Sequence, residues 1–520
     1  MRRRVFTAAA ASLLARPAFG QGRARVLKFV PQSNLASPDP VWTTATIATI
    51  HGHMVWDSLY GVDTKLNPKP QMVARDEVSA DGLTWTLHLR DGLVFHDGEP
   101  VHAADCVASV KRWAARNAFG QLLNERLAEM LALDDRRLQL WLTRPYPLLP
   151  YALGATSCFM MPERIAQTAP TTQIEEFIGS GPYRFIPDQW LSGAHAEYAR
   201  FDRYVPRDEA PDGYAGGKVA NFDRVQWLIQ PDPATAIAAL QTGEVDWVEQ
   251  PLIDLLPSLQ KRRAIKVQVN DPLGTMKMLV FNQLHPPFDN PKLRRALLPA
   301  IAQQDFIGAI VGAQDTLGRT GVGFFPEGSL YASGAGLDAL TSPRDLALSK
   351  RLIAESGYKG EPIVLLQPTD AAPLLAISEI ALDLSKRLGL NVRPESMDLG
   401  TLTARRNKQD PVEQGGWSCI PVNWNGLYVA TPLSTSLTAN GRDGWVGWAD
   451  STQRQALRAA WLDAVDEAAR KRIAPEVQAE AFGTVPFIPV GQYFQPTAFR
   501  SDLTGFVRAP FSVFWGVRRT

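Results

Sequence analysis

The sequence predicts an α/β protein built from two or three domain-sized units. A chain of 520 residues can bury more than one core, because single cores stop growing at about 250 to 300 residues. Strand-like and helix-like segments alternate along the chain, which favours a layered α/β architecture. Its 45% hydrophobic and 21% charged residues are ordinary for a soluble globular protein. The formal net charge is +1 and no long basic run occurs, so neither nucleic acid nor an anionic membrane is an expected partner.

Residues 1–20 predict a cleaved signal peptide. They combine a basic start, a short apolar centre and a small-residue end at Ala18-Phe19-Gly20, the expected cleavage site. The apolar run is too short to span a bilayer. Arg3-Arg4-Val5-Phe6 also matches the core of a twin-arginine signal, so the Sec and twin-arginine export routes both stay open. No cysteine stands at the cleavage site, so we expect a soluble periplasmic protein without a lipid anchor.

Residues 70–110 predict a β-hairpin followed by a helix. Asp81-Gly82 is a tight-turn dipeptide, because glycine takes the positive φ that a hairpin turn requires. Trp85, Leu87 and Leu89 alternate with polar residues, which is the period of a half-buried strand. From residue 103 to residue 110, apolar side chains recur at helical spacing.

The alternation of strands and helices continues toward the C-terminus. Asp232 and Pro233 mark the start of a helix and Gly243 marks its end. This helix lies between strands expected at 224–230 and 245–248. Further elements are expected as a helix capped by Asn290, helices at 345–358 and 376–388, and strands at 363–366 and 391–394.

Taken in order, these segments resemble the extracytoplasmic solute-binding proteins of family 5, the peptide/nickel class that serves bacterial ABC importers. GSGPYRF at 179–185 and LVFNQLHPPFDNPKLRRAL at 279–297 also match the family pattern. His102 and Cys106 depart from it. The resemblance implies a bilobed, periplasmic-binding-protein-like fold of the class II type, with an extra subdomain inserted in lobe one. The expected division is lobe one at 21–55, 178–272 and 491–520, the inserted subdomain at 56–177, and lobe two at 273–490.

The resemblance also implies a binding function rather than catalysis. Two hinged lobes would close around a small solute and present it to an ABC permease and ATPase complex at the inner membrane. No cofactor is needed for this, and a monomer is expected. Whether the chain serves transport or sensing stays open.

In the family, the ligand wall of lobe two is built around a Gly-Trp pair, which here is Gly416-Trp417. In peptide-binding members, an Asp three residues after this Trp holds the α-ammonium of the ligand; here that residue is Ile420. A buried ammonium without a partner costs about 3 to 5 kcal/mol, so ordinary peptides are doubtful ligands unless Asp398 or Glu413 substitutes. The expected ligand contacts in this wall are Trp417, Ser418, Ile420, Asn423, Trp424, Asn425 and Tyr428.

The opposite wall is expected to include the loop after the first strand. Leu35 aligns with a position that can touch ligand, and Trp42 lies close by. Core packing is an alternative for these residues and for the aromatic residues of lobe two, because large apolar side chains are buried in most folds.

Two alternative functions have weaker sequence support. Ser258 and Lys261 form an S-x-x-K motif, but the companion motifs of an acyl-transfer enzyme are absent. His51 and His53 fall on a predicted helix, where residues two apart point about 200° apart and do not share one metal ion. A carrier of a chelated metal and a peptide binder that uses another acidic residue stay open. The three cysteines, which we expect to be buried thiols with one disulfide as the alternative, are Cys106, Cys158 and Cys419.

Overall fold

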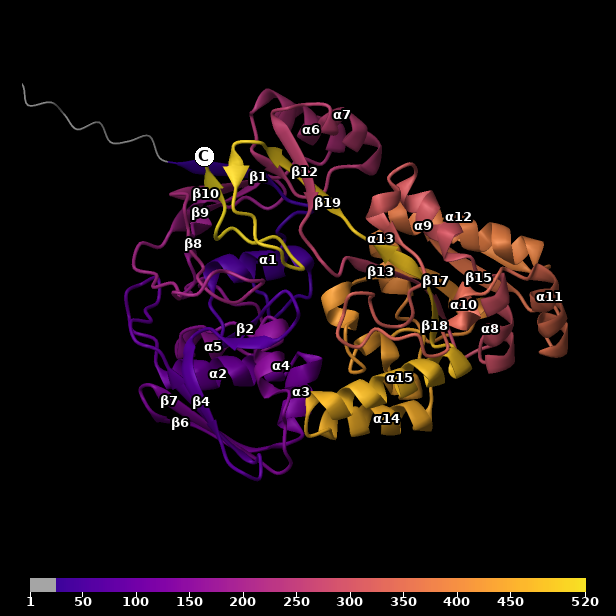
Figure 1. The fold of residues 1–520 in the computed structure, drawn as a ribbon, viewed down its shortest axis with the longest axis horizontal. Helices are drawn as coiled ribbons and strands as arrows, with labels where there is room; N and C mark the ends of the chain where they lie inside the picture. Colours follow the sequence, from indigo (N-terminus) through magenta and orange to yellow (C-terminus); the bar gives the residue numbers. More distant parts are fainter. Residues whose placement is uncertain (1–24) are drawn as a thin grey trace, which may run out of the picture.

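The chain forms two halves that lie side by side, as the computed structural model of residues 25–520 shows (Figure 1). The three larger sheets have seven, six and four strands. The first half holds the seven-stranded and four-stranded sheets, and the second half holds the six-stranded sheet (Figure 1). The expected signal peptide lies outside the described residues.

The seven-stranded sheet contains both the first strand of the chain and one of its last. Its order is β12-β19-β11-β1-β10-β9-β8, and β1 pairs parallel with β10 and with β11. Phe29, Trp227 and Trp247 of its central strands pack on Phe514, so the C-terminal segment belongs to this half. The strands are β1 (Val26–Val30), β8 (Tyr183–Phe185), β9 (His195–Arg200), β10 (Arg224–Leu228), β11 (Trp247–Val248), β12 (Ile265–Val269) and β19 (Pro496–Arg500). The α-helices of this part are α1 (Thr46–Val55), α6 (Pro233–Thr242) and α7 (Leu256–Gln260).

Helix α6 confirms the predicted start and end signals. The carboxylate of Asp232 accepts a hydrogen bond from the backbone N–H of Thr235 at 2.7 Å. Gly243 ends the helix in the left-handed conformation, with φ at 82°, which glycine adopts without strain. The strand after it is shorter than predicted.

The hairpin predicted within residues 70–110 is present in the four-stranded sheet. Its turn contains Gly82 with φ at 71°, and alternate residues of β5 are buried. The sheet order is β4-β5-β7-β6. The strands of this subdomain are β2 (Tyr60–Val62), β3 (Pro68–Pro70), β4 (Val73–Val78), β5 (Thr84–Leu89), β6 (Leu127–Asp134) and β7 (Arg137–Leu142). Its helices are α2 (Ala103–Ala114), α3 (Ala118–Asn124), α4 (Leu149–Ala155) and α5 (Glu163–Ala166).

The six-stranded sheet forms the core of the second half. Its order is β14-β18-β13-β17-β15-β16, with α9 packed on β18 and α12 packed on β15 and β17. The strands are β13 (Thr275–Phe281), β14 (Gly318–Arg319), β15 (Ile363–Pro368), β16 (Val392–Met397), β17 (Cys419–Asn425) and β18 (Phe487–Tyr493). The helices are α8 (Pro291–Leu297), α9 (Gln303–Val311), α10 (Asp338–Thr341), α11 (Leu346–Glu355), α12 (Ala372–Arg387), α13 (Leu399–Arg405), α14 (Thr452–Asp463) and α15 (Glu467–Thr484).

Shorter elements complete the chain. The C-terminal hairpin pairs β20 (Leu503–Thr504) with β21 (Arg518–Arg519). The short 3₁₀-helices are η1 (Pro187–Gln189), η2 (Ile253–Leu255), η3 (Leu298–Ala300), η4 (Asp315–Leu317), η5 (Val412–Gln414), η6 (Gly426–Val429), η7 (Thr435–Leu437) and η8 (Gly441–Asp443).

Two connections cross directly from one sheet to the other. Residues 270–274 lead from β12 to β13, and residues 494–495 lead from β18 to β19. These two short crossings are far apart in the sequence but lie side by side in the structure. They form the hinge-like junction between the halves. Residues 491–493 pair with β13 in the six-stranded sheet, whereas the expected division had assigned them to lobe one.

Candidate functional site

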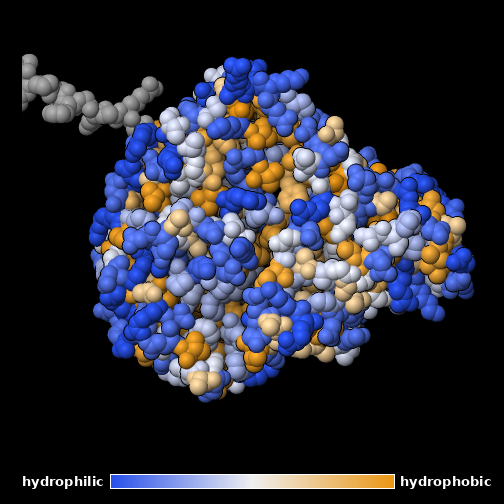
Figure 2. All heavy atoms as spheres, in the orientation of Figure 1, coloured by the Kyte–Doolittle hydropathy of each residue, from blue (hydrophilic) through white to orange (hydrophobic). Residues whose placement is uncertain are grey.

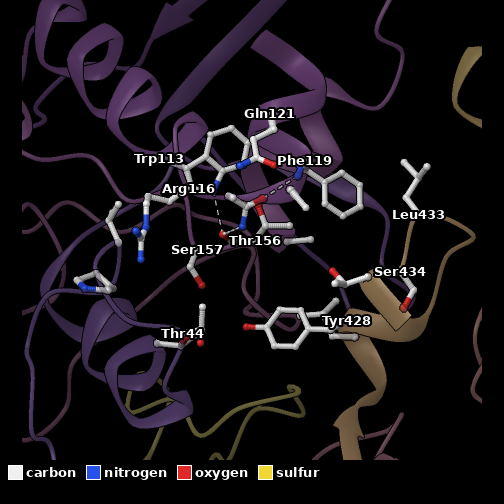
Figure 3. A pocket seen from close by; sticks show the side chains of 18 of the residues that line it. Thr44, Trp113, Arg116, Phe119, Gln121, Thr156, Ser157, Tyr428, Leu433 and Ser434 are labelled. Carbon is white, nitrogen blue, oxygen red and sulfur yellow. Dashed lines mark hydrogen bonds between the residues drawn. The ribbon is translucent and has the colours of Figure 1, made fainter. Parts of the chain in front are cut away.

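A cavity of about 420 Å³ lies where the inserted subdomain, the first half and the second half meet. Figure 3 shows its side chains converging from these three parts, and Figure 2 shows apolar atoms along the furrow between the halves. We call this cavity the aromatic chamber. Its lining comes from residues 40–49 in the first half, 113–157 in the inserted subdomain and 424–435 in the second half.

The lining of the aromatic chamber is largely apolar and carries few charges. Its aromatic residues are Trp113, Phe119, Tyr151, Trp424 and Tyr428, and its hydroxyl groups come from threonine and serine residues of all three parts. Among the described residues that line it, Arg116 is the only charged one. The chamber therefore suits a planar or apolar group with a few hydrogen-bonding atoms.

A second cavity of about 300 Å³ lies beside the crossing connections, and we call it the polar chamber. Its charged residues are Glu249, Asp271 and Lys277. Burial raises the pKa of Glu249 and that of Asp271 to about 7, and burial lowers the pKa of Lys277 to about 7. Near neutral pH, small changes in the chamber can therefore change the protonation of all three groups.

Both carboxyls of the polar chamber are already hydrogen-bonded by the protein. Glu249 accepts from the hydroxyl of Ser512 at 2.9 Å and from the backbone N–H of Gln32 at 2.8 Å. Asp271 accepts from Asn425 Nδ2 at 3.0 Å and from a backbone N–H two residues on. These bonds fix both carboxyls at the chamber wall.

Tyr428 and Phe511 form the partition between the two chambers. Tyr428 lines the aromatic chamber, Phe511 lines the polar chamber, and their ring centroids lie 5.7 Å apart. Burial raises the pKa of Tyr428, so its hydroxyl is neutral and can donate a hydrogen bond.

The end of β17 supplies residues to both chambers. Trp424 lines the aromatic chamber, while Asn423 and Asn425 line the polar chamber. This alternation follows from the two-residue period of a strand. The structure thus brings together four of the predicted lobe-two residues at one end of a strand and in the 3₁₀-helix after it: Asn423, Trp424, Asn425 and Tyr428.

Trp417, Ser418 and Ile420 line neither chamber among the described residues. Trp417 is 1% exposed, and its indole Nε1 donates to the backbone oxygen of Arg406 at 3.0 Å. The Ser418 hydroxyl accepts from a backbone N–H of β15, and Ile420 is fully buried. At about 3.3 Å per residue, Ile420 lies about 10 Å along β17 from Asn423, the nearest residue of the strand that lines a chamber.

Neither Leu35 nor Trp42 is among the described residues that line the aromatic chamber. Leu35 is 1% exposed and packs in the core of the first half. Trp42 is 38% exposed, and its backbone oxygen accepts a hydrogen bond from Arg116 Nη2 at 3.2 Å. The same loop contributes other residues, Val41 and Thr44 among them, to the lining.

Sequence reasoning missed the contribution of the inserted subdomain and the three charged residues of the polar chamber. Spacing along the chain cannot show that α3 and α4 face the end of β17. Lys277 did carry a signal, because it is a lone charge inside the otherwise apolar strand TMKMLVF. A charged residue in such a strand marks a position where the side chain lies outside the apolar core.

The residues behind the alternative functions have structural roles. His51 Nδ1 lies 2.8 Å from the Tyr198 hydroxyl, and His53 stacks on Tyr214, so both histidines pack in the core. The Ser258 hydroxyl donates to a backbone oxygen within its own turn. Within residues 25–520, no cluster of three or more His, Cys, Asp or Glu side chains is arranged to hold a metal ion. The cysteines are free and buried, as the simpler prediction had it: Cys106, Cys158 and Cys419.

The comparisons with known proteins agree with this architecture. Residues 67–444 match the family described as "Bacterial extracellular solute-binding proteins, family 5 Middle". A "probable peptide ABC transporter periplasmic-binding protein" of Sinorhizobium fredii is 38% identical over 500 residues, covering 94% of this chain and 92% of that protein. A glutathione-binding protein of Salmonella typhi is 24% identical over 494 residues, covering 93% and 92%.

A solved structure has the same fold. It is the binding protein AgaA from A. tumefaciens R10 in complex with agropinic acid, with a TM-score of 0.77, 21% identity, and coverage of 95% of this chain and 99% of that one. No described helix is long and apolar enough to cross a membrane. The chain belongs to family 5 of the bacterial extracellular solute-binding proteins, which are substrate-binding components of ABC importers and not enzymes.

Proposed function

We propose that this protein captures one small organic solute in the aromatic and polar chambers and delivers it to an ABC permease and ATPase complex. The observation that carries the proposal is the joint lining of the aromatic chamber by both halves and the inserted subdomain. A solute seated there contacts parts that separate when the halves open, so it favours the closed state. The permease can then recognise the loaded protein by its shape.

We further propose that an ordinary peptide is not the ligand. The position that holds the α-ammonium in peptide binders is Ile420 when it is counted from Trp417. When it is counted from Trp424, which lines a chamber, the position is Leu427, and this residue is also apolar. Neither Asp398 nor Glu413 lines a chamber among the described residues. An α-ammonium in the aromatic chamber would therefore have no carboxylate partner.

A peptide ligand held in another way is the second candidate. The carboxyls of Glu249 and Asp271 in the polar chamber could receive an ammonium group, and the Sinorhizobium relative is named for peptide transport. In that case the amino terminus of the peptide would point toward the crossing connections. If, as we propose, an ordinary peptide is not the ligand, di- to pentapeptides should bind only weakly.

The proposal also includes a cellular location and an oligomeric state for the mature chain. A cleaved signal peptide at residues 1–20 would release the mature chain into the periplasm, where it acts as a monomer. Peptide mass mapping of the exported protein, with a first residue near 21, supports this placement, and an uncut N-terminus contradicts it.

Tryptophan fluorescence tests the site with a matched pair of variants. Glutathione, agropinic acid and a set of di- to pentapeptides serve as probes, and a probe that binds raises the melting temperature. We expect the fluorescence change on binding to persist in Trp417→Phe and to become smaller in Trp424→Phe, because of these two residues Trp424 lines a chamber and Trp417 does not; Trp113, which also lines the aromatic chamber, retains part of the change. The opposite result would move the site to the neighbourhood of Trp417.

A further inference from the structure

Lys277 is a buried amine that lines the polar chamber and has no hydrogen-bond or ion-pair partner among the described residues. It lies in β13, opposite Asn423 of β17, and is 3% exposed. Its Nζ lies 5.1 Å from the centroid of the Tyr493 ring. Within residues 25–520, no acceptor lies within hydrogen-bonding or ion-pairing distance of this Nζ. Burial of an ammonium without an anionic partner is unfavourable, so the site has an unmet need for an acceptor.

The carboxyls of the same chamber do not meet this need. Glu249 and Asp271 each accept two hydrogen bonds from other groups of the protein. Burial also raises the pKa of each to about 7, which weakens their negative charge below neutral pH. Among the described residues that line it, the chamber therefore has two carboxyls that accept hydrogen bonds and one amine without a hydrogen-bond acceptor.

A second feature of the chamber also favours an anion. Helix α12 spans 16 residues, and its N-cap Ala371 and the first-turn residues Pro373 and Leu374 line the chamber. The N-cap residue is Ala371, which provides no side-chain acceptor for the first backbone N–H groups. Pro373 has no N–H, and the N–H groups of Leu374 and Leu375 both donate to the backbone oxygen of Ala371 at 2.9 Å. What this helix end offers is therefore mainly the partial positive charge of the helix dipole, which attracts a negative group from outside.

We propose that Lys277 and the uncapped N-terminus of α12 form a subsite for a carboxylate group of the captured solute. This inference rests on the proposed function and names the ligand class: an organic acid whose carboxylate lies in the polar chamber. Its less polar part then lies against Tyr428 or beyond it in the aromatic chamber. Sugar acids and other organic acids satisfy this requirement, and uncharged solutes do not.

Binding of the carboxylate is expected to be coupled to proton uptake. Burial lowers the pKa of Lys277 to about 7, and an adjacent carboxylate raises it again because it favours the ammonium form. The other titratable groups that line the chamber are Glu249, Asp271 and Tyr493. Burial raises the pKa of Tyr493, so this residue stays neutral over the relevant range.

Acetate is a suitable probe, because it carries the proposed group and nothing else. Reductive methylation with ¹³C-formaldehyde labels lysine amines, and the Lys277 signal is assigned by its absence in Lys277→Met or, if that variant does not fold, in Lys277→Arg. We expect the titration midpoint of this signal to rise by about half a pH unit once acetate reaches about twice its dissociation constant. Acetamide, which has the same shape without the charge, should leave the midpoint unchanged.

Lys266 provides the internal control, since it is an exposed lysine on β12. A shift of the Lys277 midpoint with acetate, without a shift at Lys266, supports the subsite. An unchanged Lys277 midpoint, or equal shifts at both lysines, overturns it. Because the fluorescence test of the proposed function uses different probes and Trp424, failure of one experiment does not imply failure of the other.

Discussion

Arg126 of the inserted subdomain and Asp463 at the end of α14 form an ion pair across the two halves. The distance from Arg126 Nη2 to Asp463 Oδ1 is 2.5 Å. The Arg126 side chain is 3% exposed and the Asp463 side chain is 50% exposed. Figure 1 shows α3 and α14 meeting at this point, at the opposite end of the interface from the crossing connections. The pair therefore joins the halves where hinge motion would separate them most.

The first prediction is that Asp463→Asn favours the open state. A half-exposed ion pair contributes about 1 kcal/mol, which shifts a closed-to-open equilibrium about fivefold. Small-angle scattering of the ligand-free protein should give a larger radius of gyration for the variant. Glu467→Gln is the control, because its similarly exposed carboxylate pairs with Lys471 within one helix. Equal radii for wild type and Asp463→Asn would show that the pair does not hold the halves together.

The second prediction concerns Asp39, whose carboxylate forms a buried ion pair with Arg112 at 2.7 Å. Asp39→Ala leaves the buried guanidinium unpaired, and we expect a loss of about 3 to 5 kcal/mol in the free energy of unfolding. Burial alone would raise the pKa of Asp39, but the hydrogen bonds and charge of Arg112 outweigh it and lower the pKa. The stabilisation is thus present above the unfolded-state pKa and is lost as pH falls through the folded-state pKa.

Denaturant titration measures this loss, and Asp383→Ala is the control. Asp383 pairs with Arg387 on the surface of α12, where a change within about 0.5 kcal/mol is expected. A similar small effect for Asp39→Ala would mean that Arg112 finds another partner.

The third prediction concerns the pH dependence that Glu249 imposes. Burial raises the pKa of this carboxyl from 4.5 to about 7 in the folded state, so the folded protein binds its proton more tightly than the unfolded chain. Its contribution to stability is therefore full below pH 4.5 and is lost as pH rises to about 7. Glu249→Gln should become more stable relative to wild type over this interval, by at most about 3 kcal/mol.

Chemical denaturation of both proteins at a series of pH values tests the sign. The difference in the free energy of unfolding between the variant and wild type should grow between pH 4.5 and 7 and then level off. A difference that stays constant would show that Glu249 ionises normally.

The fourth prediction gives Gly416 a structural role. A Cβ atom at this position would lie 1.9 Å from the backbone oxygen of Asp410, so Gly416→Ala should destabilise the protein by several kcal/mol or prevent folding. Gly483 in α15 has open space around it. Gly483→Ala should be neutral or stabilising by up to about 1 kcal/mol, because alanine is the better helix former. Thermal unfolding distinguishes the two, and equal melting temperatures would contradict the close approach at Gly416.

The sequence predicted much of the fold because local signals decide where elements begin and end. Asp345 caps α11, which begins where the helix at 345–358 was expected, and α8 gives way to a 3₁₀-helix at Pro299. Helix α12 begins four residues before the expected position, because Pro373 fits the first turn of a helix. Such signals act over a few residues and can be seen in a single chain.

The site was only partly predictable, because it depends on which strand end reaches the cavity. The pattern around Trp417 pointed to the start of β17, whereas the chambers lie at the other end of this strand, where Trp424 is. The wall supplied by Trp113 and Phe119 comes from a subdomain about 300 residues earlier in the chain, and no spacing rule connects the two segments. Lys277 required knowledge of the register of β13 against β17.

The most direct test of the account is a crystal structure of the protein purified from its own periplasm with its ligand retained. We predict density for one small organic acid between the halves, with its carboxylate at Lys277 and the first turn of α12. Its remainder should lie near Tyr428 and Trp424. A ligand bound outside both chambers, while the two chambers hold only solvent, would contradict the central claim.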